Sequence, residues 1–320
     1  MKVRTAGELG YCFGVSKAIE KAIKYADEHG GRLYTLGTLA HNENVVEYLR
    51  SHGIEPVPFE KPHPSMPGKW AKVSHGNIAI TAHGAPPEIY ERLNEFKMNI
   101  LDCTCPIVRR AQKVASQQLD GFDIVIFGDP DHQEVIGLNG WAHGAKFVGN
   151  LNDLFLSNQA LKTFKLSRRV GIISQTTKIP AMFADFVTTL INRNMGRFNE
   201  VRVFNTICPI VSARVNETRK LAEEVDMMIV VGSQESANTR NLEMVCRQAI
   251  TRAQGMVEPW AVTLVQDVDQ VGETLSDWWI ENEMAFPRVG VTGGTSTPIE
   301  VVNEVVNKLK ELLFERESGN

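Results

Sequence analysis

The chain has 320 residues, of which 43% are hydrophobic and 22% are charged, which is the composition of a globular protein and excludes a disordered, collagen-like or fibrous chain. Its 34 basic and 38 acidic residues give a formal net charge of −4 without any basic block, so nucleic acid is not an expected partner. The N-terminus lacks an apolar signal core, and apolar runs such as Met227–Val231 are too short to span a bilayer. We therefore expect a soluble, cytoplasmic protein without membrane contact.

The first predicted elements follow Cys12. Apolar residues at helical spacing over residues 15–26 predict a helix. The segment 33–37 is short, apolar and closed by glycine, which predicts a buried strand of a parallel sheet. A second strand is predicted at 77–82, and it ends in a polar loop that contains His83.

The next predicted elements follow Cys105, which opens the text Cys-Pro-Ile-Val. A segment of helical character leads into a buried strand at 123–128, again closed by glycine. A second strand at 170–174 runs into a loop that contains Thr176 and Thr177.

The last predicted elements follow Cys208, which repeats the text Cys-Pro-Ile-Val. A buried strand is predicted at 226–232 and a second one at 288–292. The second strand ends in Gly-Gly-Thr-Ser at residues 293–296, a loop rich in backbone N–H groups.

These three series of elements are in register. Four residues after each strand-closing glycine stand His41, His132 and Ser236, and a proline near a predicted helix start follows each second loop. We therefore predict an α/β fold of three related units, which comprise residues 1–100, 101–200 and 201–320. In this prediction the C-terminal segment of the chain can pack on the first unit. Three such units close most simply around a pseudo-threefold axis. Because functional residues gather beyond the carboxyl ends of parallel strands, the three cysteines and the polar loops would then line one cavity.

Three thiolates on one axis suit an iron–sulfur cluster or a zinc ion. Structural zinc normally takes four protein ligands, often in closely spaced pairs. A [4Fe-4S] cluster held by three cysteines keeps one iron without a protein ligand, and such an iron can bind a substrate oxygen. The alternative is that Cys12, Cys105 and Cys208 are small buried hydrophobes, as free cysteines often are. The matching spacing of cysteine, strand and polar loop in the three units argues against this alternative. For Cys103 and Cys246, which have no counterparts in the repeat, burial is the expected role.

Polar side chains in the predicted loops suit an anionic ligand. Histidines supply N–H donors and hydroxyls and amides supply neutral donors; the candidates are His41, His83, His132, Thr177, Ser236, Asn238 and Ser296. Glu134 follows His132 by two residues, and a carboxyl enclosed beside a cluster would have a raised pKa and could deliver protons. The alternative for Glu134 is an ordinary acid in the first turn of a helix, stabilised by the helix dipole.

At this point the motifs resemble those of a known family, the 4-hydroxy-3-methylbut-2-enyl diphosphate reductases of the non-mevalonate isoprenoid pathway. The resemblance covers nearly the whole chain and rests on many short motifs in one order. Among them are Gly10-Tyr11-Cys12-Phe13-Gly14, Ala82-His83-Gly84, Thr104-Cys105-Pro106, His132-Gln133-Glu134-Val135, Ser174-Gln175-Thr176-Thr177 and Ser236-Ala237-Asn238-Thr239.

The resemblance implies a trefoil of three α/β units around a central [4Fe-4S] cluster held by Cys12, Cys105 and Cys208. It implies an oxidoreductase that removes the allylic hydroxyl of its diphosphate substrate as water, after that hydroxyl binds the unique iron, and forms isopentenyl and dimethylallyl diphosphate. Electrons would come from a ferredoxin or a flavodoxin, since the sequence has no nicotinamide-binding fingerprint.

The same resemblance implies roles for individual residues. The diphosphate would be held by His41, His83, Ser236, Asn238 and Ser296. Glu134, His132 and Thr176 would be catalytic as a proton relay, and His132, Thr176 and Thr177 would also contact the substrate.

The chain departs from the family pattern in its third unit. Ala237 stands where the family usually has a second serine, and Glu235 brings negative charge toward the expected diphosphate site. Two alternatives therefore remain beside the reductase. One is a paralogous [4Fe-4S] reductase or dehydroxylase that acts on a different or less charged substrate, and the other is a non-catalytic, cluster-based redox sensor.

Overall fold

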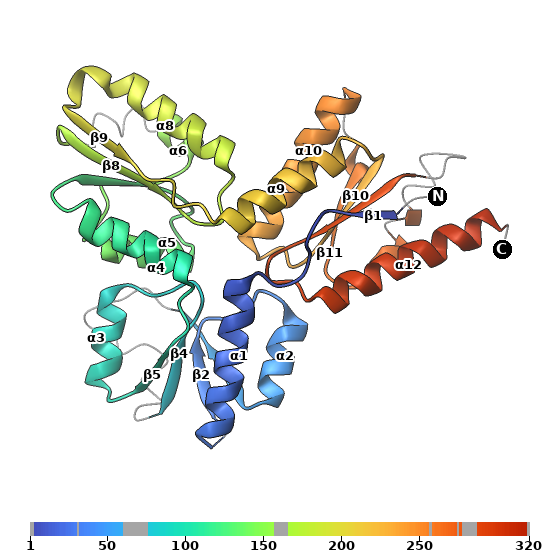
Figure 1. The fold of residues 1–320 in the computed structure, drawn as a ribbon, viewed down its shortest axis with the longest axis horizontal. Coiled ribbons are helices and arrows are strands. Elements are labelled where there is room, and N and C mark those ends of the chain that lie inside the picture. Colours follow the sequence, from blue (N-terminus) through green and yellow to red (C-terminus); the bar gives the residue numbers. More distant parts are fainter. Residues whose placement is uncertain are drawn as a thin grey trace. The chain divides into compact units, whose positions relative to one another are not determined.

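The computed structural model describes residues 3–30, 32–59, 76–156, 166–255, 258–273, 275–276 and 287–318 (Figure 1). The chain divides into two compact units. The terminal unit comprises Met1–Phe13, Ala40–Val45 and Pro209–Asn320, and the central unit comprises Gly14–Leu39 and Val46–Cys208.

The central unit contains two parallel four-stranded sheets (Figure 1). The first has the strand order β3 (Ile54–Val57), β2 (Leu33–Leu36), β4 (Asn77–Ile80), β5 (Asn99–Asp102), and the second has the order β7 (Phe147–Gly149), β6 (Asp123–Phe127), β8 (Arg169–Ser174), β9 (Glu200–Val203). The helices that connect these strands are α1 (Phe13–Glu28), α2 (Glu43–Ser51), α3 (Pro87–Glu95), α4 (Pro106–Lys113), α5 (Gln133–Trp141), α6 (Leu151–Leu156) and α8 (Pro180–Asn194).

The terminal unit contains the third parallel sheet. Its strand order is β11 (Val262–Val265), β10 (Met227–Val231), β12 (Val289–Gly293), β1 (Val3–Thr5), and its helices are α9 (Pro209–Ala222), α10 (Ala237–Gln254) and α12 (Ile299–Glu317). The strand order repeats that of the other two sheets, but the fourth place is taken by β1 from the start of the chain, in the register Val3 opposite Val289. The two ends of the sequence thus complete one sheet.

Burial explains why these segments form strands. All five residues of β10 are fully buried, as expected for a parallel strand that is covered on both faces. Valines and leucines of α12 pack on this sheet, and the C-terminal helix contacts β1, β10 and β12. In the central unit the ring of Phe127 packs against the rings of Phe183 and Phe186, with centroids 5.8 and 5.0 Å away.

The predicted α/β class is confirmed, with three parallel sheets of four strands each. The six predicted strands form as β2, β4, β6, β8, β10 and β12. The remaining strands were not predicted, because most have only three or four residues and several lie half-exposed at a sheet edge. β5 and β9 lie at the predicted boundaries near residues 100 and 200. β5 pairs with β4 and β9 pairs with β8, so each belongs to the sheet formed by the strands that precede it. The domain boundaries and the closure around a threefold axis stay predictions.

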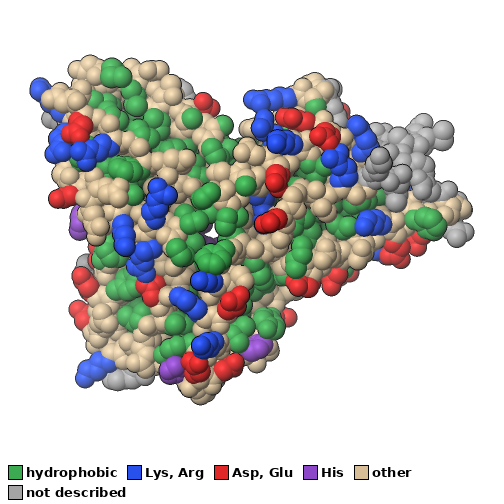
Figure 2. Space-filling model, viewed as in Figure 1, with side chains coloured by type: hydrophobic (Ala, Val, Ile, Leu, Met, Phe, Trp, Pro, Cys, Tyr) green, Lys and Arg blue, Asp and Glu red, His purple; other side chains and the backbone are tan. Residues whose placement is uncertain are grey.

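Proline marks the starts of several helices. Pro87 and Pro180 are the first residues of α3 and α8, and Pro298 is the N-cap of α12. A proline at a helix start loses no hydrogen bond there, which explains the recurrence of this residue after the polar loops. None of the described helices is long and apolar enough to cross a membrane. Basic and acidic side chains are interspersed over the face shown in Figure 2.

Candidate active site

The three predicted cluster ligands occupy equivalent places in the three sheets. Each cysteine stands directly before a helix, and its backbone N–H donates to a carbonyl in the loop after a neighbouring strand. The three bonds are Cys12 N to Thr295 O (3.0 Å), Cys105 N to Ala82 O (3.0 Å) and Cys208 N to Thr176 O (2.9 Å). None of the three cysteines forms a disulfide, and thiolate sulfur is the ligand that iron–sulfur clusters take, so the donor set fits such a cluster.

The cysteines are divided between the two units. Cys105 and Cys208 belong to the central unit and Cys12 to the terminal unit. Within the described parts of the chain, no three His, Cys, Asp or Glu side chains are grouped so that they could hold one metal ion. The meeting of the three sulfur atoms at one centre stays a prediction. Cys103 and Cys246 are buried, and burial raises the pKa of both thiols, that of Cys103 to about 12. They are core residues.

Glu134 is held inside the central unit by Thr176. The carboxyl lies in the first turn of α5 and is only 1% exposed. Its Oε1 accepts a hydrogen bond from the backbone N–H of Thr176 at 2.6 Å, and its Oε2 accepts one from Thr176 Oγ1 at 2.8 Å. Burial raises the pKa of Glu134 to about 7, against the lowering effect of the Thr176 hydrogen bonds and of the charge on Lys178. A carboxyl with this pKa can both hold and release a proton near neutral pH.

Two histidines continue this group of residues. His132 caps α5, where its Nδ1 accepts the N–H of Glu134 at 3.1 Å. In a neutral ring this assigns the proton to Nε2, which is then a donor. The rings of His83 and His132 meet edge to face with centroids 5.5 Å apart. The central unit therefore joins His83, His132, Glu134 and Thr176 through consecutive contacts.

Thr177 lies beside this group. It is half-buried, and its Oγ1 accepts a hydrogen bond from Gln175 Nε2 at 2.9 Å. The loop after β8 thus presents two neighbouring hydroxyls, of which that of Thr176 is committed to Glu134.

Gln133 ties the loops of the first sheet to α5. Its Nε2 lies within hydrogen-bond distance of Leu36 O (3.1 Å), Thr81 Oγ1 (3.0 Å) and Gly84 O (3.2 Å). The side chain of Gln133 also lies close to the backbone of Gly37, where φ is +81°. A Cβ at this glycine would lie 2.6 Å from Gln133 Oε1. The sequence alone assigns no role to Gln133, because its contacts join segments that lie far apart in the chain.

The terminal unit contains buried polar side chains, several of which have no hydrogen-bond partner among the described residues. Ser236 caps α10 by accepting the N–H of Thr239 at 3.3 Å. Asn238 Nδ2 and Oδ1, Thr239 Oγ1 and Ser296 Oγ are buried and make no hydrogen bond to any residue that the structure describes. An unsatisfied buried polar group costs about 1–3 kcal/mol, so such a set indicates a place that a polar ligand completes.

The loops that carry these residues are in contact. A Cβ at Gly294 would lie 2.3 Å from Thr239 Oγ1, so only glycine allows the loop after β12 to approach α10 this closely. Gly294 N also donates to Val231 O at 2.9 Å. The terminal unit thereby brings the Ser296 loop to the helix that carries Asn238.

His41 lies in the same unit, half-buried beside charged residues. Burial lowers its pKa, Glu235 raises it and Arg240 lowers it further. Glu235 itself is exposed, and Ala237 is buried in the first turn of α10. The acidic residue that departs from the family pattern therefore acts on the charge of His41.

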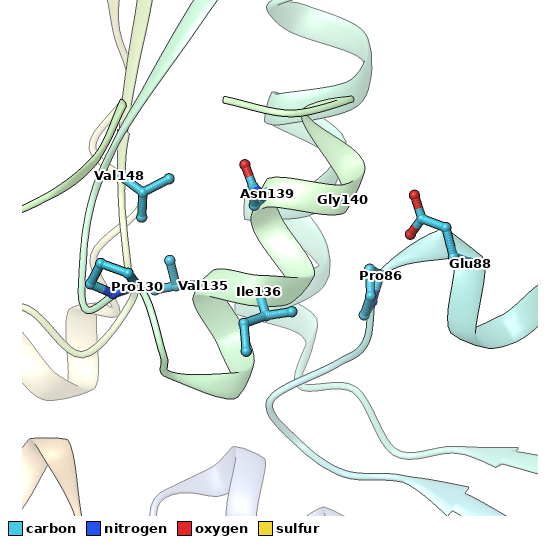
Figure 3. A pocket seen from close by; sticks show the side chains of 8 residues that line it. All are labelled: Pro86, Glu88, Pro130, Val135, Ile136, Asn139, Gly140 and Val148. Atoms are coloured by element: carbon cyan, nitrogen blue, oxygen red, sulfur yellow. The ribbon is translucent and has the colours of Figure 1, made fainter. Parts of the chain in front are cut away.

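A separate pocket of about 470 Å³ lies in the central unit, beside α5 and the start of α3 (Figure 3). Its lining residues are Pro86, Glu88, Pro130, Val135, Ile136, Asn139, Gly140 and Val148. None of the predicted site residues is among them, although Val135 and Ile136 follow Glu134 directly. The predicted site and this pocket are different places.

The full length of the chain resembles known proteins. The family model described as LytB protein matches residues 3–310. The 4-hydroxy-3-methylbut-2-enyl diphosphate reductase of Alkaliphilus oremlandii is 34% identical over 319 residues, which are 98% of this chain and 100% of that protein. The reductase of the same name from Dehalococcoides mccartyi is 35% identical over 313 residues, which are 98% of this chain and 99% of that protein.

Solved structures agree with these relatives. One is a structure of (E)-4-hydroxy-3-methyl-but-2-enyl diphosphate reductase, the terminal enzyme of the non-mevalonate pathway, with 28% identity, a TM-score of 0.61 and coverage of 97% of this chain and 100% of that one. The structure of the Plasmodium falciparum E-1-hydroxy-2-methyl-but-2-enyl-4-diphosphate reductase has 24% identity and a TM-score of 0.76. The match covers 95% of this chain and 86% of that one, and it supports the fold. The resemblance predicted from the motifs is confirmed, and the chain belongs to the LytB protein family.

Proposed function

We propose that this chain is an oxidoreductase that converts 4-hydroxy-3-methylbut-2-enyl diphosphate to isopentenyl and dimethylallyl diphosphate. The reaction consumes two electrons and two protons and releases the allylic hydroxyl as water. The observation that carries the proposal is the buried Glu134–Thr176 pair, whose carboxyl has a pKa of about 7, in a chain that aligns over its length with relatives bearing the name of this reductase. The paralogous reductase and the redox sensor find no comparable support.

We propose that Cys12, Cys105 and Cys208 hold a [4Fe-4S] cluster. Support comes from their equivalent positions before three helices. When bound, the cluster supplies the electrons of the reduction and a Lewis-acidic iron. Each cysteine needs a fixed backbone to serve as a ligand, and the N–H bonds to the neighbouring loops provide it.

The Glu134–Thr176 pair is the proposed source of protons. An ionised Glu134 accepts from the Thr176 hydroxyl, whereas a protonated Glu134 can donate to Thr176 Oγ1, whose own proton can then pass onward. Nε2 of His132 is a second donor, because Nδ1 is occupied by the N–H of Glu134. Together with Thr177, these residues are proposed to contact the substrate around its hydroxyl.

The diphosphate is proposed to bind to donors that make no hydrogen bond to the described residues. Asn238 and Ser296 carry such buried donors, and Ser236 lies two residues before Asn238. Phosphate oxygens are strong acceptors and would satisfy these groups, with His41 and His83 as additional donors. Thr239, which the sequence did not single out, has an equally unpaired Oγ1 and joins the candidates.

We further propose that a ferredoxin or a flavodoxin delivers the electrons and that the enzyme works in the cytoplasm. The sequence supports the first point because it lacks a nicotinamide-binding fingerprint.

The test is anaerobic turnover. Purified and reconstituted protein should be brown, contain iron and acid-labile sulfide, and bleach in air. With a chemical reductant it should consume the hydroxylated allylic diphosphate and form both products. A loaded protein that leaves saturating substrate unchanged would exclude the reductase, and a colourless protein with one zinc would exclude the cluster.

A further inference from the structure

Arg214 is a buried cation whose two hydrogen-bond acceptors in the described structure are uncharged. The side chain lies on α9 and is 5% exposed. Its Nη1 donates to Gly293 O at 3.1 Å and its Nη2 donates to Gly10 O at 3.0 Å. Both acceptors are neutral carbonyls, and no carboxylate of the described residues lies within ion-pair distance of the guanidinium. A buried charge is costly unless an opposite charge compensates it.

Two glutamates and Cys12 lie near Arg214. Burial lowers the pKa of Arg214, and the charges of Cys12, Glu217 and Glu8 oppose that lowering. Both glutamates are exposed to solvent. The buried groups that hold the guanidinium are therefore the two neutral carbonyls of Gly10 and Gly293.

The two hydrogen bonds of Arg214 also join the segments that flank Cys12. Gly10 precedes Cys12 by two residues, and Gly293 precedes Thr295, whose carbonyl accepts the N–H of Cys12. Gly10 has a φ of +87°, and a Cβ there would lie 3.0 Å from the Cβ of Ile299. The guanidinium thus links the segment before Cys12 to the loop after β12, where the two backbones pack closely. Both segments set the position of residue 12.

We propose that Arg214 is a positioning residue for the cluster ligand Cys12 and supplies the positive charge that compensates the thiolate at residue 12 and the cluster bound to it. The inference rests on the proposed function, since it takes Cys12 as a ligand. Two separable properties follow. The forked hydrogen bonds fix the backbone before Cys12, and the charge favours the electron-rich, reduced form of the cluster.

Two substitutions separate these properties. R214K keeps the positive charge but loses the pair of hydrogen bonds to Gly293 O and Gly10 O. R214Q loses the charge but keeps an amide that can donate to one of these carbonyls. The matched control is R219Q, because Arg219 lies on the same helix with an exposed side chain. Each protein is reconstituted anaerobically and analysed for iron and sulfide per chain, for the rate of iron loss to a chelator, and for the midpoint potential of the cluster.

We expect iron loss about tenfold faster in both R214K and R214Q, as is typical when a residue that orients a metal ligand is changed. The midpoint potential should shift to more negative values in R214Q alone, because an added electron then lacks its compensating charge. R219Q should match the wild type in both measurements. R214K loses the two hydrogen bonds but keeps the charge, so a shift of potential that is confined to R214Q reports the loss of the charge.

The inference is overturned if R214Q titrates at the wild-type potential, or if R214K and R214Q lose iron at the wild-type rate. These outcomes differ from a failure of the proposed function, in which the wild type binds the cluster but does not turn over the diphosphate. A wild type that takes up no iron and sulfide would overturn both.

Discussion

The two groups of candidate site residues differ in how their polar atoms are paired. In the central unit both carboxyl oxygens of Glu134 have hydrogen-bond partners, supplied by one threonine. In the terminal unit the buried atoms of Asn238, Thr239 and Ser296 have none among the described residues. The carboxyl of Glu134 is thus paired within the protein, whereas the group around Asn238 keeps polar atoms that a ligand could satisfy.

The difference suits the roles proposed for the two groups. A proton moves only between atoms that are already within hydrogen-bond distance, so a proton relay has to be assembled in advance. A diphosphate brings its own acceptor oxygens, so the donors proposed to receive it can lack partners within the protein. An unpaired buried polar group lowers stability by about 1–3 kcal/mol, and a ligand that satisfied it would recover that loss.

The largest expected effect comes from breaking the central group. In E134Q the amide keeps the size of the side chain but cannot deliver a proton at neutral pH. We expect turnover to fall by roughly 10²–10⁴-fold, the usual contribution of a general acid, while iron and sulfide content stay at the wild-type level. The measurement is anaerobic steady-state turnover beside metal analysis.

The control for E134Q is E88Q, which changes a carboxyl on α3 that lies outside the relay and is exposed. It should turn over at the wild-type rate. Full activity in E134Q would mean that protons reach the substrate by another route.

The pH dependence of stability tests the burial of Glu134. Its pKa is raised from an ordinary 4.5 to about 7, so folding is favoured fully below about pH 4.5, and this contribution is lost as the pH rises toward 7. The loss is on the order of 3 kcal/mol for a shift of this size. We expect the difference in unfolding free energy between wild type and E134Q to change across this range, measured by denaturant titration of the cluster-free chain. A constant difference would contradict the raised pKa.

A pair of nearly isosteric substitutions sharpens the comparison between the units. T176V removes a hydroxyl that donates to Glu134 and should destabilise the ligand-free protein by about 1–3 kcal/mol. S296A removes a hydroxyl without a partner and should leave that stability unchanged or raise it by about 1 kcal/mol, yet raise KM for the diphosphate about tenfold. Equal destabilisation by both would show that the terminal group is paired in solution.

The smallest expected effect concerns His41. Glu235 raises its pKa and Arg240 lowers it. We therefore expect E235N to lower and R240Q to raise the pKa of His41, followed by NMR of its ring protons against pH. No movement in either variant would mean that the loop after β10 lies farther from His41 than in the structure.

Much of the architecture was predictable because the chain repeats itself. The buried strands such as β6 and β10 are continuous apolar runs, and glycine, proline and cysteine recur at matching distances around them. The edge strands were not predictable, because four residues with half-exposed side chains, as in β9, carry no clear periodicity. The pairing of β1 with β12 joins segments whose separation in the chain leaves no local signal.

The site was predictable only as far as residue types allow. The motifs pointed to Glu134 and Thr176, but not to the two short hydrogen bonds between them. Gln133 and Arg214 depend on tertiary contacts, since Arg214 reaches a carbonyl 204 positions away. The absence of partners around Asn238 is a property of packing, which no sequence pattern records.

The pairing of β1 with β12 has a consequence for biosynthesis. Val3–Thr5 cannot pair with β12 until residues 289–293 have been translated. The segments 14–39 and 46–208 can fold while the nascent chain is still growing. The backbone hydrogen bond from Cys12 N to Thr295 O likewise forms only after residue 295 has been made. If Cys12 is a cluster ligand, as proposed, its backbone is therefore fixed later in synthesis than that of Cys105 or Cys208.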